Sequence, residues 1–335
     1  MKPVTEPILN AAANAFDFGG PVVCDARHYG EGHINDTFVI WREDHSRRFI
    51  LQRINTDTFT DPVGLMENIC GVTRHLREKI LAAGGDPARE TLNVIPTLSG
   101  AACHLDAEGG AWRAYDFVED TICLQQVGSE ADFRTVAETL GKFQNQLADY
   151  PASTLHETIA RFHDTPNRYA NFEKALAADA LGRAKDIVPE VAFIHAREKD
   201  CHALLDLLAA GEIPLRVTHN DTKINNVLID AATGKGICVI DLDTVMPGLS
   251  AYDFGDAVRF GASSAAEDET DLSKVFLRLD MYRAYLEGYL DACGHALTEN
   301  EINVLPLGAK IITIELGMRF LKDYLDGDVY FKIDR

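Results

Sequence analysis

The sequence pattern changes once along this chain of 335 residues, near residue 120, and that change limits the folds that the chain can adopt. Before it, short runs of β-branched and aromatic residues alternate with turns that contain Gly, Asp and Ser, which is typical of antiparallel strands. A single segment there, 61–83, carries apolar residues at helical spacing. The runs that predict strands are 22–24, 37–41, 49–54, 91–98 and 112–118.

After residue 129 the pattern is mainly helical, with one interruption. Two apolar runs, 227–229 and 237–240, flank the turn 231–236 and predict a buried hairpin inside the helical part. The helices are expected over 130–149, 168–182, 190–210, 271–292 and 298–325.

These two patterns predict an α+β fold with two lobes. Residues 1–118 are expected to form a small antiparallel-sheet lobe with one helix, and residues 119–335 a larger, mainly helical lobe. No linker rich in Pro, Gly or Ser lies between the two patterns, so a tight hinge near 117–129 is expected.

The composition restricts the partners of the protein. Asp and Glu number 52 against 32 Lys and Arg, and the resulting net charge of -20 repels nucleic acid and anionic membranes. We find no apolar stretch long enough for a membrane span and no signal peptide, so a cytoplasmic protein is expected. Seven scattered cysteines indicate reduced thiols rather than a disulfide framework or a zinc site. Nothing in the pattern indicates an obligate protein partner.

The clearest motif is the run from His219 to Asn226, which has the form H-x-D-x-x-x-x-N. Phosphoryl transfer needs a carboxylate that accepts the proton of the attacking hydroxyl, and oxygen ligands that hold Mg²⁺ against the phosphates. Asp221 suits the first role, and Asn226 suits the second. Lys223 is close enough in sequence to neutralise charge on the transferred phosphate. The alternative is a loop in which Asp and Asn only cap turns.

Three later aspartates are candidates for the metal site. Asp241 ends the second apolar run of the hairpin, twenty residues after Asp221, and is expected to bind Mg²⁺ together with Asn226. Asp243 either contacts a second Mg²⁺ or caps the next turn, and both interpretations stay open. Asp253 begins the triplet D-F-G, but it follows no predicted strand, so we expect it to start a helix or to anchor the helical lobe.

The sheet-rich part contains candidates for nucleotide binding. Gly30 and Gly32 lie in a turn between two predicted strands, which favours a hairpin loop over phosphates; an ordinary β-turn is the alternative. Arg53 stands where a protein kinase strand carries its phosphate-binding Lys, and Glu67 in the predicted helix is expected to pair with it. A plain surface ion pair is the alternative for these two residues.

These residues make the chain similar to the aminoglycoside phosphotransferase and choline kinase superfamily, whose members are small-molecule kinases with a protein-kinase-like fold. The blocks that carry the resemblance span nearly the whole chain. Within the superfamily they look most like kinases that phosphorylate the 1-hydroxyl of an N-acetylhexosamine. The blocks are GEGHINDT (30–37), FILQRIN (49–55), HNDTKINNVL (219–228), IDLDTVMPG (240–248), YDFGDAVRFG (252–261) and RFLKDYLDGDVYF (319–331).

The resemblance implies ATP and Mg²⁺ as cofactors and assigns further residues to their binding. Asn35 would belong to the phosphate loop. The segment 112–119 would be the edge strand and hinge that binds adenine through its backbone, with Phe117 and Glu119 at the nucleotide. Lys223 would be a phosphate ligand.

For the acceptor, the resemblance implies a sugar pocket that contains His33, Arg319 and Tyr330 next to Asp221. Neutral and cationic donors with an aromatic face suit the hydroxyls and the acetamide of a pyranose. Arg319 as a helix-end charge and Tyr330 as a packed aromatic are the alternatives. An aminoglycoside, choline or homoserine is the alternative acceptor on the same fold, and a nucleotide-binding protein without catalysis is the alternative outside this class.

Overall fold

The computed structural model describes residues 3–30, 34–267 and 269–331. The chain forms two compact units, and each unit is made of three chain segments. Two segments beyond the predicted lobe boundary belong to the same unit as the N-terminal sheet. The first unit holds residues 1–123, 149–159 and 227–246, and the second holds 124–148, 160–226 and 247–335.

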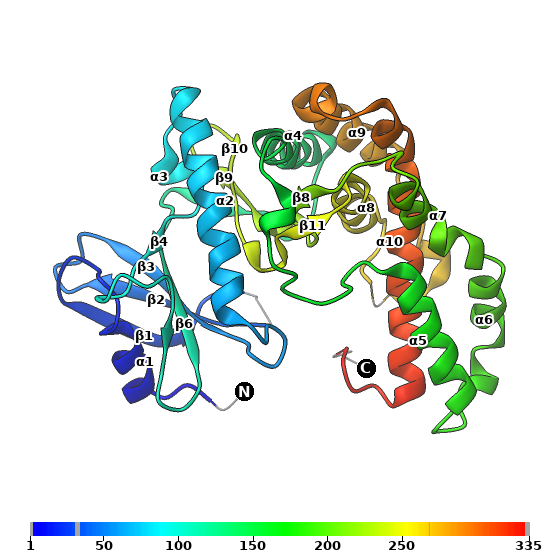
Figure 1. The fold of residues 1–335 in the computed structure, drawn as a ribbon, viewed down its shortest axis with the longest axis horizontal. Helices are drawn as coiled ribbons and strands as arrows, with labels where there is room; N and C mark the ends of the chain where they lie inside the picture. Colours follow the sequence, from blue (N-terminus) through cyan, green and yellow to red (C-terminus); the bar gives the residue numbers. More distant parts are fainter. Residues whose placement is uncertain (1–2, 31–33, 268, 332–335) are drawn as a thin grey trace. The chain divides into compact units, whose positions relative to one another are not determined.

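The first unit is built on an antiparallel sheet (Figure 1). Its strands are β1 (Val22–His28), β2 (Asp36–Arg42), β3 (Arg48–Ile54), β4 (Val94–Ile95), β5 (His104–Leu105) and β6 (Ala111–Asp116). They follow the order β1-β2-β3-β6-β4, and β5 also pairs with β6. All five predicted strands are present, but the run 91–98 forms only the short β4. Pro96 ends β4, because proline has no N–H to donate to the ladder.

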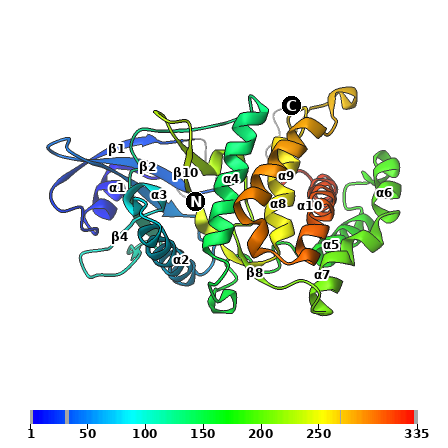
Figure 2. The ribbon, with the colours of Figure 1, turned by 90° about the horizontal axis from the view of Figure 1, so that it is seen from above.

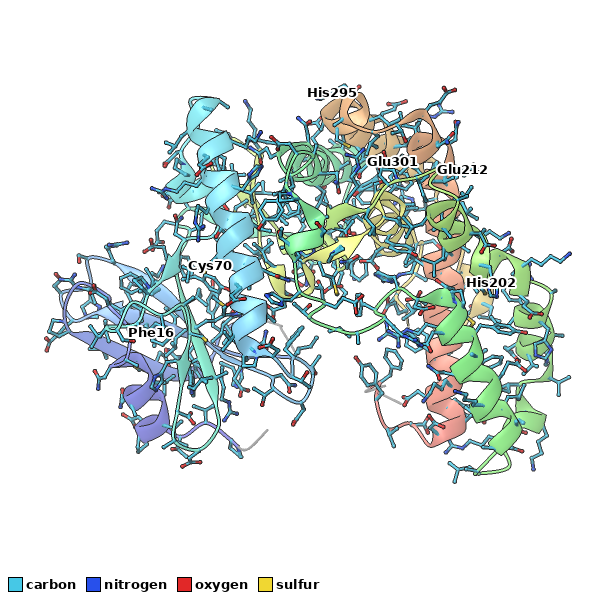
Figure 3. All side chains as sticks on the ribbon, in the orientation of Figure 1. Phe16, Cys70, His202, Glu212, His295 and Glu301 are labelled. Atoms are coloured by element: carbon cyan, nitrogen blue, oxygen red, sulfur yellow. The ribbon has the colours of Figure 1, made fainter. Side chains whose placement is uncertain are left out.

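Alternation along these strands gives the sheet two different faces. Phe38 and Ile40 of β2 lie opposite Leu51 and Phe49 of β3, and all four side chains are buried in one apolar core. Helix α1 (Glu6–Ala13) and Phe16, which is labelled in Figure 3, pack into the same core. The other face carries polar residues on β2, β3 and β6, which are described below.

The predicted helix of the first unit is α2 (Pro62–Ala82), whose N-cap Asp61 accepts the N–H of Gly64 at 2.9 Å. The expectation of a single helix in residues 1–118 was wrong, because α1 and the single turn α3 (Pro87–Glu90) are also present. Both are too short to show helical periodicity in the sequence. Their signals are local, since each has a proline in its first turn and α3 is capped by Asp86.

A second, three-stranded sheet in the first unit confirms the predicted hairpin. Strands β9 (Val227–Asp230) and β10 (Gly236–Val239) form the hairpin, and β7 (Thr121–Cys123) pairs with β9. All pairs are antiparallel. The hairpin delivers Asp241 directly after β10, at the start of the 3-10 turn Leu242–Thr244.

The second unit is mainly helical, as predicted. Helix α4 packs on α9, while α5, α7 and α8 pack on α10, and Figure 2 shows these helices side by side. In the part of the chain that the structure describes, no helix is long and apolar enough to span a membrane. The helices are α4 (Glu130–Gln146), α5 (Thr165–Ala178), α6 (Val188–His195), α7 (Glu198–Ala209), α8 (Ser250–Gly261), α9 (Leu279–Cys293) and α10 (Glu299–Asp326). Strand β8 (Arg216–Thr218) pairs with β11 (Met246–Gly248).

Two helices differ from their predicted bounds for local reasons. The segment 190–210 is split into α6 and α7, because Arg197 leaves the helical backbone region and its N–H bonds to the carbonyl of Ile194. Helix α9 begins at Leu279 rather than at residue 271, since Leu277 forms an antiparallel bridge with Ser263. Extended pairing of this kind is incompatible with helix at the same residues.

Close backbone contact between α8 and α10 explains the glycine of the D-F-G triplet. A Cβ on Gly255 would lie 2.5 Å from the backbone of Gly308, and a Cβ on Gly308 would lie 2.0 Å from the carbonyl oxygen of Ala251. Both helices therefore need glycine where they cross. Gly255 serves helix packing in this chain.

Candidate active site

The catalytic motif lies on a loop between β8 and the 3-10 turn Ile224–Asn226. Asp253 of α8, which is 4% exposed, fixes this loop through hydrogen bonds. Its carboxylate accepts the backbone N–H of His219 at 2.9 Å and that of Asn220 at 2.7 Å, and its carbonyl accepts the hydroxyl of Thr222 at 2.6 Å. Burial raises the pKa of Asp253, and the two N–H donors oppose that shift. The predicted anchoring role of Asp253 is confirmed.

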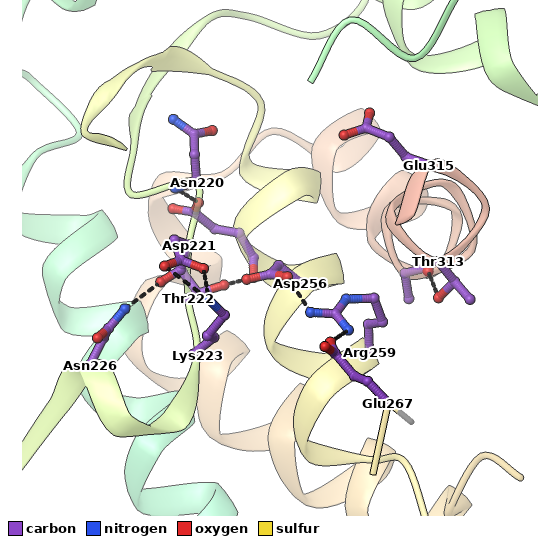
Figure 4. A network of polar contacts seen from close by, with 12 residues as sticks. Asn220, Asp221, Thr222, Lys223, Asn226, Asp256, Arg259, Glu267, Thr313 and Glu315 are labelled. Carbon is purple, nitrogen blue, oxygen red and sulfur yellow. Dashed lines mark hydrogen bonds and ion pairs between the residues drawn. The ribbon is translucent and has the colours of Figure 1, made fainter. Parts of the chain in front are cut away.

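The backbone of the loop turns sharply one residue before Asp221. Asn220 adopts a left-handed conformation with φ of 64°, which is uncommon outside glycine and tolerated by Asn. Asp221 is partly exposed and forms an ion pair with Lys223, whose Nζ lies 2.9 Å from Oδ1 (Figure 4). The structure therefore brings the two predicted catalytic side chains into contact at an accessible position.

Asn226 closes the loop behind Asp221. Its Nδ2 donates to the carbonyl oxygen of Asp221 at 2.9 Å, which fixes the orientation of the amide (Figure 4). No hydrogen bond from a described residue reaches Oδ1 of Asn226, so that oxygen can serve a hard cation.

Asp241 belongs to the first unit and also has a left-handed backbone, with φ of 60° and ψ of 54°. Its side chain is exposed at the end of β10. Strained non-glycine residues of this kind cluster at functional sites. The carboxylate of Asp241 and the amide oxygen of Asn226 are each donors of the type that Mg²⁺ prefers, and their shared metal role stays a prediction.

Asp243 has two side-chain partners within the protein that the sequence did not suggest. It is 3% exposed and forms an ion pair with Arg113 of β6, which is itself 1% exposed. Asn35 donates to its other oxygen at 2.6 Å. Burial alone would lower the pKa of Arg113, but the Asp243 carboxylate raises it above its usual value. Asp243 thus joins the β10 turn to the N-terminal sheet and has its two oxygens engaged within the protein.

A row of polar side chains across the sheet leads to Asp243. Thr37, Gln52 and Arg113 are register partners on β2, β3 and β6, so they lie side by side on the face opposite the apolar core. Gln52 donates to the hydroxyl of Thr37 at 2.9 Å and accepts from Nε of Arg113 at 2.9 Å. This row sets the direction in which the guanidinium points.

The predicted phosphate loop is described in part. Gly30 has φ of 79°, a backbone conformation that favours glycine, while Gly32 and His33 lie outside the described residues. Asn35 follows the loop and is 9% exposed. In addition to its bond to Asp243, it accepts the N–H of Asn55 at 2.9 Å. Asn35 therefore links the end of the loop to the chain just after β3.

The predicted ion pair between Arg53 and Glu67 is wrong, because each side chain has another partner. Arg53 instead pairs with Asp36 of the neighbouring strand, Nε to Oδ2 at 2.9 Å. Glu67 bonds to His156 at 2.7 Å and is 63% exposed. Glu67 lies on the exposed side of α2, because the buried face of the helix is formed by other residues, among them Met66 and Asn68.

The segment after β6 offers two backbone groups to a ligand. Within the described structure, no hydrogen bond uses the carbonyl of Phe117 or the N–H of Glu119. The side chains of both residues are held by Arg48, whose guanidinium lies 3.7 Å from the centre of the Phe117 ring and forms a bidentate pair with Glu119 at 2.8 and 2.6 Å. An acceptor and a donor two residues apart match the edge of a planar heterocycle such as adenine.

The C-terminal segment gathers the predicted acceptor residues of the second unit. Arg319 of α10 lies 5.7 Å from the centre of the Tyr330 ring and 5.4 Å from that of Phe331. The buried carboxylate of Asp323 accepts the N–H groups of Tyr330 at 2.8 Å and Phe331 at 2.9 Å. Asp323 thus folds the chain end back so that two rings face the arginine.

The sequence interpretation missed Arg113, His163, Glu315 and Asp323. His163 and Glu315 belong to no recognisable motif, while Arg113 and Asp323 lie inside quoted segments but were given no role there. Each of the four acts through a partner distant in the sequence or through the backbone. The only available signal was a charged residue inside an apolar pattern, as for Arg113 within the strand run 112–118 and Glu315 within the helical run 298–325.

Three solved structures share this fold at low sequence identity. A microcompartment-associated aminopropanol kinase has a TM-score of 0.57 at 16% identity, with 96% of this chain and 95% of that chain covered. A Plasmodium vivax ethanolamine kinase has a TM-score of 0.56 at 14% identity, with 92% of this chain and 78% of that chain covered. A spectinomycin phosphotransferase, solved with ADP and spectinomycin, has a TM-score of 0.54 at 14% identity, with 97% of this chain and 88% of that chain covered. The predicted protein-kinase-like α+β fold is confirmed.

A family model described as the phosphotransferase enzyme family matches residues 25–289. The matched range begins in β1 and ends in α9, so it includes the catalytic loop, Asp241 and the segment after β6. The chain therefore belongs to the phosphotransferase enzyme family.

Proposed function

We propose that this kinase uses ATP and Mg²⁺ to phosphorylate the anomeric 1-hydroxyl of an N-acetylhexosamine, giving the sugar 1-phosphate. The observation that carries the phosphotransfer chemistry is the loop around Asp221, where a partly exposed carboxylate contacts Lys223 and is backed by Asn226. The sequence blocks and the C-terminal cluster around Arg319 support the sugar as acceptor.

In this proposal Asp221 accepts the proton of the sugar hydroxyl. The hydroxyl oxygen forms a bond to the terminal phosphorus of ATP, the bond to ADP breaks, and the proton goes to the carboxylate of Asp221. Lys223, which balances the charge of Asp221 in the free enzyme, can turn its ammonium toward the transferred phosphate. Rigid support from Asp253 limits the motion of the loop during transfer.

Asn226 and Asp241 would hold the magnesium ion. Bound Mg²⁺ would neutralise negative charge that develops on the phosphate oxygens. The bond from Nδ2 of Asn226 to the Asp221 carbonyl leaves the amide oxygen as the end that faces the ion. The left-handed backbone of Asp241 would present its carboxylate at the end of β10.

The nucleotide would be held by the first unit. The carbonyl of Phe117 and the N–H of Glu119 would bind the adenine edge, and Gly30, Gly32 and Arg53 would lie near the phosphates. Asn35 and Glu67 have other partners, so Asn35 would position the loop, and no role at the nucleotide is proposed for Glu67.

The C-terminal cluster favours a neutral acceptor over a cationic one. Aromatic rings that bind choline-like ligands leave their faces open for the cation. Here Arg319 of the protein lies over Tyr330 and Phe331 and supplies that positive charge itself. A guanidinium beside two rings suits the hydroxyls, the acetamide carbonyl and the apolar face of a sugar. His33 is proposed as a further sugar contact on the sequence resemblance alone.

A product assay tests the acceptor. Purified protein with Mg²⁺ and ATP is incubated with N-acetylglucosamine, N-acetylgalactosamine, glucose, choline, ethanolamine, homoserine and spectinomycin, and the products are read by phosphorus NMR. We expect phosphate on C1 of an N-acetylhexosamine, identified by coupling to the anomeric proton. Phosphate on an amino alcohol or an antibiotic instead would support the kinase activity but would contradict the proposed sugar pocket.

Replacing Arg319 by Met is expected to raise the KM for the sugar by about tenfold or more, because a charged hydrogen bond to a ligand is worth roughly 1.5–3 kcal/mol. The KM for ATP should stay within about threefold, since the change removes binding of one substrate only. Steady-state kinetics with each substrate varied in turn measure both constants. Lys310→Met, on the same helix and paired with Asp200, is the matched control. Equal rises of both KM values would contradict the assignment.

A further inference from the structure

A buried ion pair beside the catalytic loop has no part in the reaction proposed above. His163 and Glu315 of α10 are 9% and 3% exposed at their side chains, and Nδ1 of His163 lies 3.0 Å from Oε1 of Glu315. Thr165 donates its hydroxyl to the other oxygen of Glu315 at 2.9 Å. Such a pair is costly to bury unless each charge is matched and bonded, as it is here.

The second nitrogen of His163 reaches the catalytic loop. Nε2 lies 3.2 Å from the carbonyl oxygen of Asn220, the left-handed residue directly before Asp221. A carbonyl oxygen and an ionised carboxylate can only accept hydrogen bonds, so both ring nitrogens must donate. Only the imidazolium has a hydrogen on each nitrogen, and His163 is therefore protonated as long as Glu315 is ionised.

The charges around His163 agree with this protonation state. Burial alone would lower the pKa of His163, and Glu315 raises it above its usual value, with Asp256 of α8 acting in the same direction. Burial would raise the pKa of Glu315, and the pairing with His163 lowers it. The other charged groups near the pair are Arg168 of α5 and Asp253 of α8, and the Tyr252 ring lies 4.9 Å from the imidazole.

The same helix carries the proposed acceptor contact. Glu315 and Arg319 are four residues apart on α10 and so lie on one side of it, one turn from each other (Figure 4 labels Glu315). Glu315 thus connects the helix that would hold the sugar to the carbonyl that precedes the proposed base.

We propose that protonated His163, held by Glu315, is a positioning residue that fixes the Asn220 carbonyl and thereby orients Asp221 toward an acceptor on α10. This proposal rests on the proposed role of Asp221. The two bonds of His163 together need the imidazolium, which is present at low pH. As the pH rises through the raised pKa of His163, the ring keeps one hydrogen, and the stronger acceptor, the Glu315 carboxylate, holds it on Nδ1, so the bond from Nε2 to Asn220 is lost. Turnover then falls on the alkaline side.

The test is the pH dependence of kcat in Glu315→Gln. Glutamine can still accept from Nδ1 but brings no charge, so the alkaline fall in kcat should move to lower pH by about one unit or more. At acidic pH the variant should approach the wild type, and its KM for ATP should stay within about twofold. In His163→Gln we expect the fall to disappear and kcat to drop by about 10- to 100-fold at every pH.

The control is Glu173→Gln, which removes the same charge from an exposed pair with His195, formed at 2.7 Å between α5 and α6. Its pH profile should match that of the wild type. An unshifted alkaline fall in Glu315→Gln would overturn the proposal, as would a shift of equal size in the control.

A second measurement needs neither catalysis nor a stable variant. In wild-type protein with ¹⁵N-labelled histidine, one buried imidazole should keep hydrogens on both nitrogens to a higher pH than the exposed imidazoles do. Detection of only neutral buried rings would reject the protonated state. The kinetic arm uses whichever acceptor is phosphorylated in the product assay. A wrong sugar assignment therefore fails in that assay, while a wrong positioning role fails here.

Discussion

Replacing Asp221 by Asn is expected to lower kcat by about 10²- to 10⁴-fold, the usual contribution of a general base. Asparagine keeps the size of the side chain but cannot accept the proton of the acceptor hydroxyl. The KM for ATP should change by less than about threefold, because the adenine contacts proposed at Phe117 and Glu119 lie on a different part of the chain. Loss of turnover with retained nucleotide binding is the mark of a group that acts in the transition state.

The measurement is steady-state kinetics with the acceptor identified by NMR, together with fluorescence titration of a nucleotide analogue. Asp291→Asn is the matched control, since Asp291 is an exposed carboxylate of α9 that pairs with Arg134. It removes one negative charge from the same unit and should leave kcat unchanged. Wild-type turnover in Asp221→Asn would remove Asp221 from the role of base, and Asp241 would become the next carboxylate to test.

The motif residues were predictable because their relation is local. Asp221, Lys223 and Asn226 lie on one short loop, where spacing alone brings the residues close, and the structure shows contacts between them. The strands β2, β3 and β6 were predictable for the same kind of reason, since alternation shows directly which side chains share a face. The metal role of Asn226 and Asp241 stays a prediction.

The partners of these residues were not predictable, because they depend on contacts between distant segments. His163 lies 57 residues before Asn220, and Glu315 lies 152 residues after His163. Charge alone also misled the interpretation of Glu67, which was paired with Arg53 on the analogy with protein kinases. The helical pattern indicates that Glu67 is exposed, since the buried residues of α2 form a face that does not include it.

Asp241 and Asp243 are chemically similar but differ in burial, which the sequence did not indicate. Asp241 and Asp243 are both carboxylates in one short segment after β10, and the sequence offered a metal role for each. The structure leaves Asp241 exposed and gives Asp243 two buried partners, Arg113 at 130 residues' distance and Asn35 at 208. An ion at Asp243 would compete with Arg113 for the carboxylate and would leave the buried guanidinium without its counter-charge.

Replacing Arg113 by Met is expected to destabilise the first unit by about 3–5 kcal/mol, since it leaves the carboxylate of Asp243 buried without its counter-charge. Both tryptophans of the chain, Trp41 and Trp112, lie on strands of the N-terminal sheet, so their fluorescence during urea unfolding reports on this unit. The double variant Arg113→Met/Asp243→Leu should recover much of the loss, because no unpaired charge remains.

The control is Arg27→Met, which removes an exposed arginine paired with Asp25 on β1 of the same sheet and should leave the unfolding midpoint unchanged. A loss of stability in Arg113→Met as small as that of the control would mean that water reaches Asp243. No recovery in the double variant would show that the bond from Asn35 to Asp243 carries the stability instead. In the expected case the pair keeps the turn after β10 in place, and we expect the left-handed conformation of Asp241, two residues earlier, to be lost with it.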